Sequence, residues 1–144
     1  MTVSHILNAK GRDVVTAKSG DLIMSVVQTL AKLRIGAVVI LNDAGRIEGI
    51  ISERDVVRVL GSEGALALDY KVSKVMTSKV RTCTEADSET ELMAMMTENR
   101  IRHLPVVNGS KLAGMISIGD LVKFRIEAIE REAAEMKAYI SSSG

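Results

Sequence analysis

The sequence predicts an α+β fold made of two copies of a β-α-β-β-α unit and a C-terminal helix. Two observations predict it: the chain of 144 residues contains an internal repeat, and each copy alternates short apolar runs with helical periodicity. A unit of about 60 residues is marginal on its own, and its helices cover only one face of its sheet. We therefore expect the copies to pack sheet to sheet about a pseudo-twofold axis, with two equivalent clefts where they meet.

The repeat runs through most of the chain. Residues 72–123 align with residues 3–58 at an offset that falls from 69 to 66 and then to 65 residues. The offset changes in turns, because the first copy has three extra residues near 10–12 and one more between 42 and 48. Insertions confined to turns are typical of a structural repeat. We expect a first repeat at residues 1–64, a second at 65–125, and a C-terminal helix with a frayed tail at 126–144.

The first copy is expected to open with a short strand at residues 14–17. A helix follows, with Asp21 as its candidate N-cap. Its apolar face recurs at helical spacing and consists of Leu22, Val26, Leu30 and Leu33. The apolar runs 37–41 and 47–51 flank the turn-forming residues 42–45 and predict a hairpin. A second helix begins near Asp55.

The second copy predicts the same order of elements. Asp87 or Ser88 is the candidate N-cap of its first helix. The apolar face of that helix comprises Leu92, Met93 and Met96, with Met95 as a further candidate. The runs 104–107 and 112–116 predict a hairpin, and the intervening Asn108 and Gly109 permit the positive φ that both central residues of a tight turn need. A final helix begins near Asp120.

Two segments of the repeat carry a resemblance to a known family. They read Gly49-Ile50-Ile51-Ser52-Glu53-Arg54-Asp55 and Gly114-Met115-Ile116-Ser117-Ile118-Gly119-Asp120. They match the pattern Gly-hydrophobic-x-[Ser/Thr]-x-x-Asp of the CBS domain, the regulatory module named after cystathionine β-synthase. The stretches 75–77 and 102–107 match two more recurring segments of that family. The chain therefore resembles a tandem, stand-alone pair of CBS domains over about residues 3 to 125.

A serine at a strand end and an aspartate three residues later place a hydroxyl and a carboxylate on one short turn. A carboxylate accepts two donors side by side, such as the vicinal hydroxyls of a ribose, and the amides of a helix N-terminus suit a phosphate. The plain alternative is that these residues only cap helices. The family resemblance implies ribose binding by Asp55 and Asp120, with Ser52 and Ser117 toward the phosphate.

Arg102 and His103 come just before an apolar strand, and a solvated basic pair is the simple interpretation. The resemblance places this pair across the cleft from Asp55, where Arg102 can bind a phosphate and His103 can add a donor. Arg54 strengthens that side, because its counterpart in the second copy is a glycine. Asp120 is expected to be faced only by residues 36 and 37, Gly and Ala. We predict a phosphate-binding Asp55 cleft and a weaker Asp120 cleft for an uncharged group.

An adenine ring needs an apolar slot with polar groups at its edge. Two sets of residues are candidates, although each residue can equally belong to the plain core. The first set is Val15, Thr16, Ile35 and Ile51, and the second is Val80, Thr82, Ile101 and Ile116.

Composition excludes several function classes. A net charge of +1 and 2% aromatic residues argue against nucleic-acid and membrane partners. Neither a long apolar stretch nor a secretory signal is found, so we expect a cytoplasmic protein. No metal-ligand spacing and no catalytic constellation occur, so we expect no metal, no catalytic residue, no catalytic cofactor and no enzyme. The lone Cys83 is expected to be a small hydrophobe, with a redox role as the alternative.

The C-terminal segment predicts a contact between subunits. Its apolar residues alternate spacings of four and three, as in a coiled-coil seam. They are Val122, Ile126, Ile129, Ala133, Met136 and Ile140. The alternative is a helix packed on its own domain. We expect the helix to pair with a second copy in a homodimer.

Together these features predict a regulatory sensor that binds an adenine nucleotide without turning it over. The resemblance implies AMP first, then ADP, ATP or NAD(H), and a regulated protein that the sequence does not identify. S-adenosyl ligands fit less well, because Arg54, Arg102 and His103 favour phosphate. The competing hypotheses are a ligand-free dimerisation or adaptor scaffold, and an enzyme that uses Cys83.

Overall fold

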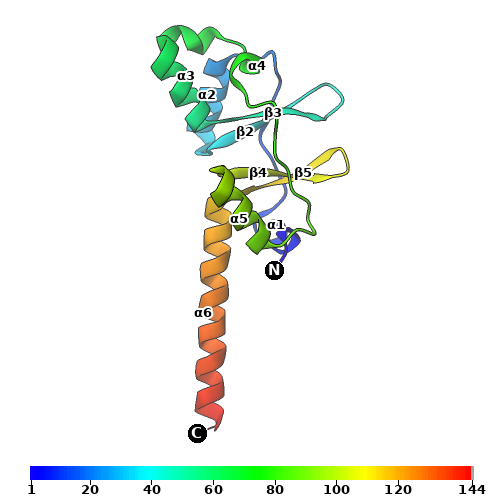
Figure 1. The fold of residues 1–144 in the computed structure, drawn as a ribbon, viewed down its shortest axis with the longest axis vertical. Coiled ribbons are helices and arrows are strands. Elements are labelled where there is room, and N and C mark those ends of the chain that lie inside the picture. The colour runs from blue at the N-terminus through cyan, green and yellow to red at the C-terminus, as the bar shows by residue number, and fades with distance from the viewer. Residues whose placement is uncertain (144) are drawn as a thin grey trace.

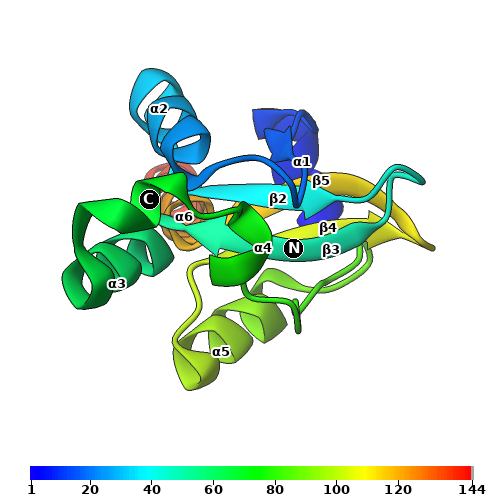
Figure 2. The ribbon, with the colours of Figure 1, turned by 90° about the horizontal axis from the view of Figure 1, so that it is seen from above.

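The computed structural model describes residues 1–143 and consists of two small sheets flanked by helices. The helices are α1 (Val3–Lys10), α2 (Ile23–Leu33), α3 (Glu53–Glu63), the 3-10 helix η1 (Gly64–Asp69), α4 (Val72–Val75), α5 (Glu89–Asn99) and α6 (Ile118–Ser143). The strands are β1 (Thr16–Ala17), β2 (Ala37–Leu41), β3 (Ile47–Ser52), β4 (His103–Asn108) and β5 (Lys111–Ser117). The β2–β3 hairpin lies over the β4–β5 hairpin (Figures 1 and 2). The predicted α+β architecture of two stacked repeats is confirmed.

The two sheets are less alike than the repeat predicts. In the first, β1 pairs parallel with β2, and β2 pairs antiparallel with β3. The second contains only the antiparallel pair β4 and β5. Its expected first strand is reduced to a single bridge, in which the Cys83 N–H donates to the Pro105 carbonyl and the Cys83 carbonyl accepts from Val107. The prediction of a full strand there is therefore wrong.

The start of α2 differs from the prediction. Leu22, not Asp21, is the N-cap residue, and Asp21 instead accepts a hydrogen bond from the Lys18 amide at 3.0 Å. The predicted apolar face is also only partly right, because Leu22 and Leu33 are exposed. The buried face consists of Ile23, Val26 and Leu30.

The other capping and turn predictions are closer. Ser88 caps α5 by accepting from the Glu91 amide at 3.1 Å, as one of the two alternatives predicted. In the second hairpin Asn108 pairs with Lys111, so the turn lies one residue later than predicted. Of the expected pair only Gly109 has a positive φ, at 64°. The hairpin is confirmed, but the prediction that Asn108 is a central residue of its turn is wrong.

The two hydrophobic cores exchange their first helices. Val3, Ile6 and Leu7 of α1 pack with Leu92, Leu104 and Ile116 of the second copy. Val72 of α4 packs in turn with the core of the first copy. Each core therefore crosses the boundary expected near residue 64, and neither repeat is complete without a segment of the other.

The first glycine of each repeated motif makes this exchange possible. A Cβ atom on Gly114 would lie 2.9 Å from both Leu7 methyl carbons. A Cβ atom on Gly49 would lie 2.5 Å from Met76 Sδ and 2.9 Å from the Thr77 carbonyl oxygen. Both positions thus need glycine because a segment of the other copy passes directly over the strand.

The last helix leaves the domain. Leu121 is fully buried at its base, whereas every residue from 131 to 142 is exposed. The helix continues to Ser143, where fraying was expected, and residue 144 lies outside the described residues. The alternative that the apolar seam packs on its own domain is wrong, because the helix projects away from it (Figure 1). Among the described residues, no helix is long and apolar enough to cross a membrane.

Candidate functional site

Asp55 lies at the junction of β3 and α3, in a compact capping arrangement. Its Oδ2 atom accepts from the Ser52 amide at 2.9 Å and from the Ser52 hydroxyl at 3.0 Å. The Asp55 amide donates back to Ser52 Oγ at 3.3 Å. The capping role considered from the sequence is therefore present. It occupies one carboxylate oxygen, while Oδ1 accepts no hydrogen bond from the described residues and remains available to a ligand.

The amides of this helix N-terminus are largely occupied. The Glu53 N–H donates to the Gly36 carbonyl at 3.0 Å, and the Asp55 N–H is held by Ser52. The Ser52 hydroxyl itself points its proton to Asp55. A negatively charged ligand would therefore depend on side-chain cations here more than on the helix terminus expected from the sequence.

Asp55 opens into a pocket of about 500 Å³ between the two copies. Its walls come from the β3–α3 junction of the first copy, and from the segment after α4 and the α5–β4 junction of the second. The lining residues are Gly36, Ile50, Ser52, Glu53, Arg54, Asp55, Arg58, Thr77, Lys79, Val80, Arg81, Asn99, Arg100, Ile101, Arg102 and His103. The structure thus brings Asp55, Arg54, Arg102 and His103 together, as expected.

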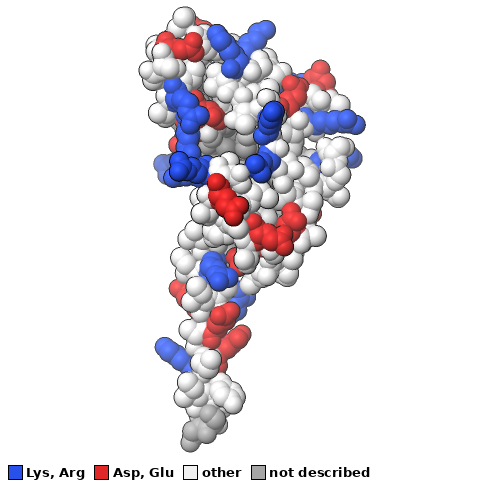
Figure 3. Space-filling model, viewed as in Figure 1, with Lys and Arg blue, Asp and Glu red and all other residues white. Residues whose placement is uncertain are grey.

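The pocket is strongly positive. Six lining residues carry Lys or Arg charges, namely Arg54, Arg58, Lys79, Arg81, Arg100 and Arg102, against only Glu53 and Asp55. None of these six forms an ion pair within residues 1–143. Blue side chains gather beside the hollow between the two halves (Figure 3). A concentration of uncompensated cations in a concave site attracts a polyanion.

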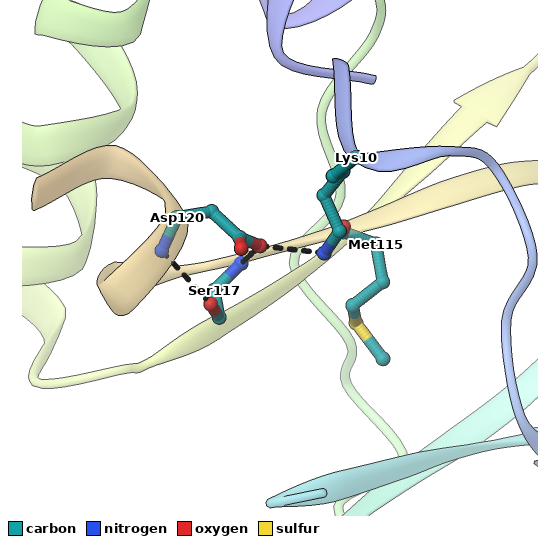
Figure 4. Close-up of polar contacts among 4 residues, drawn as sticks. All are labelled: Lys10, Met115, Ser117 and Asp120. Carbon is teal, nitrogen blue, oxygen red and sulfur yellow. Dashed lines mark hydrogen bonds and ion pairs between the residues drawn. The ribbon is translucent and has the colours of Figure 1, made fainter. Parts of the chain in front are cut away.

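The equivalent junction in the second copy is already occupied by a cation. Asp120 Oδ2 accepts from the Ser117 amide at 2.9 Å, and Lys10 Nζ lies 2.5 Å from the same oxygen (Figure 4). Lys10 also donates to the Met115 carbonyl at 2.8 Å. The expectation that Asp120 is faced only by Gly36 and Ala37 is wrong, because the C-terminal end of α1 brings Lys10 across from the other copy.

Lys10 also sets the charge state of Asp120. Burial would raise the pKa of this carboxyl, but the hydrogen bond and charge of Lys10, together with Ser117, bring the pKa below its ordinary value. Asp120 is therefore held as a carboxylate by its own chain. A ligand entering this cleft would have to displace an ammonium group, which no ligand has to do at Asp55.

His103 is the side chain that lies between the two junctions. Its ring and the Glu53 carboxylate both lie against Gly36, where a Cβ atom would be 3.0 Å from Cε1 and 2.9 Å from Oε1. Burial lowers the pKa of His103, and this outweighs the opposing charges of Glu53 and Asp120. The imidazole is therefore neutral at pH 7 and offers a single N–H donor.

The candidate adenine residues separate into three groups. Val80 and Ile101 line the Asp55 pocket, although they come from the second copy, and they lie there with Ile50 and Thr77. Ile51 and Ile116 are fully buried in the two cores. Val15 and Ile35 pack against the first core, while Thr16 and Thr82 are exposed and lie outside the pocket.

The cations Arg58, Lys79, Arg81 and Arg100 are members of the site that the sequence analysis missed. Arg100 ends α5 with a left-handed φ of 53°, and its carbonyl accepts from Arg54 across the copies at 3.3 Å. The sequence does contain a sign of these four cations, because basic residues cluster on both sides of residues 80 and 101. Only the exchange of segments shows that these clusters face Asp55.

Cys83 is buried and is not among the residues that line this pocket. The thiol is 3% exposed, and burial raises the pKa of Cys83 to about 12, with a smaller contribution from Asp87. A protonated, buried thiol is a poor nucleophile. Within the described residues no group of three His, Cys, Asp or Glu side chains is placed to hold a metal ion.

Comparison with known proteins agrees with this geometry. The family model of the CBS domain matches residues 3–62 and 72–127. The mitochondrial CBS domain-containing protein CBSX3 of Arabidopsis thaliana is 31% identical over 96% of this chain and 71% of its own length. The crystal structure of the CBS-domain containing protein ATU1752 from Agrobacterium tumefaciens is 43% identical, with a TM-score of 0.84 over 86% of this chain and 92% of that one.

A more distant structure shows the same fold with ligands bound. The CBS domain pair of protein MJ0100, in complex with 5-methylthioadenosine and S-adenosyl-L-methionine, has a TM-score of 0.80 and 23% identity. The match covers 89% of this chain and 98% of that one. The fold of two CBS repeats is therefore shared at a sequence identity of only 23%.

Proposed function

The chain belongs to the CBS-domain family, and from this premise we propose that it is a regulatory module that binds an adenine nucleotide in the Asp55 pocket and does not turn it over. The observation that carries the proposal is the six Lys and Arg side chains around that pocket, none of which is ion-paired within residues 1–143. Keeping like charges together is unfavourable unless a ligand compensates them.

The proposed ligand uses three parts of the pocket. The ribose hydroxyls donate to Oδ1 of Asp55, the oxygen that the capping contacts leave open. The phosphates lie among the cations, where Arg102 binds bidentately and the neutral His103 adds one donor. The adenine ring occupies the apolar wall formed by Ile50, Val80 and Ile101.

The charge of the pocket ranks the ligands. Six cations against two acidic residues favour AMP, ADP, ATP and NAD(H) over S-adenosylmethionine and methylthioadenosine, which carry no phosphate. The MJ0100 pair shows that this fold accommodates the adenosine moiety. The proposed phosphate preference rests on the six basic side chains that line the pocket of this chain.

The position of the pocket suggests how binding is transmitted. Its walls come from both copies, so a bound nucleotide links the β3–α3 junction to the α5–β4 junction. Such a ligand shifts the packing of the copies by as much as its affinity differs between the two arrangements. We propose that a partner protein responds to this shift, so that the chain reports the energy or redox state of the cell.

The test is isothermal titration calorimetry of the full chain with AMP, ADP, ATP, NAD, NADH and S-adenosylmethionine. We expect the phosphorylated ligands to bind, and Asp55→Asn to weaken binding about 10- to 100-fold, since a hydrogen bond to a charged group contributes about 1.5–3 kcal/mol. Asp120→Asn is the matched control and leaves this binding unchanged. If none of these ligands bound, the result would favour the ligand-free scaffold. If both variants weakened binding equally, the assignment of the pocket would be overturned.

A further inference from the structure

The exposed apolar seam of α6 is the feature that nucleotide binding leaves unexplained. Ile126, Ile129 and Met136 are 51%, 55% and 61% exposed and succeed one another along the helix. The helix projects from the domain, and its residues 131–142 are all exposed (Figure 1). A helical segment of this length is marginal in water without packing of its apolar face. The seam therefore requires a partner.

The spacing of the seam fixes its heptad positions. With Val122, Ile129 and Met136 at d, the a positions are Ile126, Ala133 and Ile140. The flanking e positions are then Lys123, Glu130 and Lys137, and the g positions are Arg125, Glu132 and Tyr139. These flanking residues decide which partner and which orientation the seam accepts.

We propose that the partner is a second copy of this chain, and that the two α6 helices pair in parallel and in register. In that arrangement each g residue faces the e residue five positions later on the other helix. Arg125 then meets Glu130, and Glu132 meets Lys137, so both flanking contacts join opposite charges on each side of the pair. Arg125 already contacts Glu89 at 3.0 Å with one nitrogen, which leaves the rest of its guanidinium group for this contact.

The antiparallel alternative is disfavoured by the same residues. With full overlap of the seams, e faces e and g faces g. Glu130 and Glu132 would each face their own copy, and Lys123 would face Lys137. Like charges in such positions are destabilising. A parallel pair also places both nucleotide-binding domains at the same end of the coiled coil, since each domain precedes its α6.

Sedimentation velocity of the full chain at increasing concentrations tests the dimer. We expect twice the 15.5 kDa chain mass for the native protein. Ile129→Glu should return it to the monomer, and Ala134→Glu, at an exposed b position, should leave the dimer intact. Because both residues are exposed, the two-repeat domain should stay folded in either variant, and circular dichroism should show at most a loss of helix signal from the projecting part of α6 in Ile129→Glu. A monomeric native chain, a trimer, or a dimer that survives Ile129→Glu would each overturn the proposal.

The orientation is tested separately by Met136→Cys. In the parallel pair this position meets itself, so mild oxidation should produce a disulfide-linked dimer on a non-reducing gel. The buried Cys83 supplies a control, because the native chain should remain uncrosslinked. A dimer in which Met136→Cys does not crosslink, while a mixture with Ile126→Cys does, would show antiparallel pairing and contradict the proposed orientation. Nucleotide titration of Ile129→Glu shows independently whether the Asp55 pocket still binds.

Discussion

Replacing Lys10 by methionine should open the second cleft. In the native chain the Lys10 ammonium contacts Asp120 Oδ2 at 2.5 Å and the Met115 carbonyl at 2.8 Å, whereas the Asp55 carboxylate has no cation on it within residues 1–143 (Figure 4). Methionine keeps most of the length of the lysine side chain and removes its charge. The Asp120 carboxylate of the Lys10→Met variant then becomes available to ribose hydroxyls.

The size of the effect follows from the exposure of the ion pair. The two side chains are 36% and 24% exposed, so their interaction is stronger than that of a fully exposed pair, worth up to about 1 kcal/mol, but well below that of a buried one. We take about 1–2 kcal/mol as the free energy that a ligand must supply to displace Lys10. This corresponds to a second site about 5- to 30-fold weaker in the native chain than in the variant.

The assay is calorimetric titration with AMP in the Asp55→Asn background, in which binding at the first pocket is weakened. In this background Lys10→Met should strengthen the binding of AMP about 5- to 30-fold. Lys18→Met is the matched control, since Lys18 pairs with Asp43 in an exposed contact and does not line the Asp55 pocket. If Lys10→Met leaves the affinity at the second cleft unchanged, the ammonium group does not block it and the reasoning is refuted.

The same variant has a second measurable consequence. Because the pKa of Asp120 is lowered in the folded chain, this carboxylate stabilises the fold above its ordinary value of 3.8, and the stabilisation is lost as the pH falls through the lowered pKa. Lys10→Met removes the main cause of the lowering. The variant should therefore lose less free energy of unfolding between pH 6 and pH 3 than the native chain does, as measured by urea denaturation.

Three further predictions concern stability. Gly49→Ala should lower the free energy of unfolding by about 2–3 kcal/mol and Gly114→Ala by about 1 kcal/mol, because the first Cβ atom meets a backbone carbonyl and the second only mobile methyl groups; equal losses in urea denaturation would contradict this. Since the pKa of His103 is lowered, the unfolded chain binds the extra proton, and stability should fall as the pH drops through 6.5 toward the lower folded value. His103→Gln should flatten that profile, and an unchanged slope would exclude His103 as its cause. Arg34→Gly and Arg100→Gly should each raise the melting temperature, because both arginines have a left-handed φ that glycine adopts without strain and each gains about 0.5–1 kcal/mol. Only Arg100→Gly should weaken nucleotide binding, so a loss in both variants would show an indirect effect.

The parts of the fold that could be predicted are those fixed within one copy. The hairpins at 37–52 and 103–117 follow from apolar runs around turn residues, and the serine–aspartate junctions follow from the repeated motif. Errors of a single residue at Leu22 and Asn108 arose because neighbouring residues compete for the same cap or turn. Local patterns identify such an element reliably but leave its end uncertain by a residue.

The exchange of α1 and α4 between the cores was not predictable from periodicity, because it depends on contacts between the two copies rather than within one copy. Leu7 packs over Gly114, and Met76 over Gly49, yet each of these residues also fits an ordinary amphipathic helix or strand of its own copy. The exchange explains why Val80 and Ile101 line the pocket of Asp55. The candidate adenine residues were grouped by copy, whereas the pocket of Asp55 is lined by Ile50 of the first copy and by Val80 and Ile101 of the second.

The Asp55 and Asp120 junctions differ because the two copies of the repeat differ at only a few positions around them. The three extra residues of the first copy fall at 10–12, and there the chain carries Lys10 into the cleft of Asp120. The corresponding segment of the second copy is three residues shorter, and Asp55 has no such ion-pair partner within residues 1–143. The basic residues after α4 and at the end of α5 then add charge on the Asp55 side alone. The two serine–aspartate junctions are thus alike in their capping bonds, but the end of α1 pairs one carboxylate with Lys10, while within residues 1–143 the other has no cation partner.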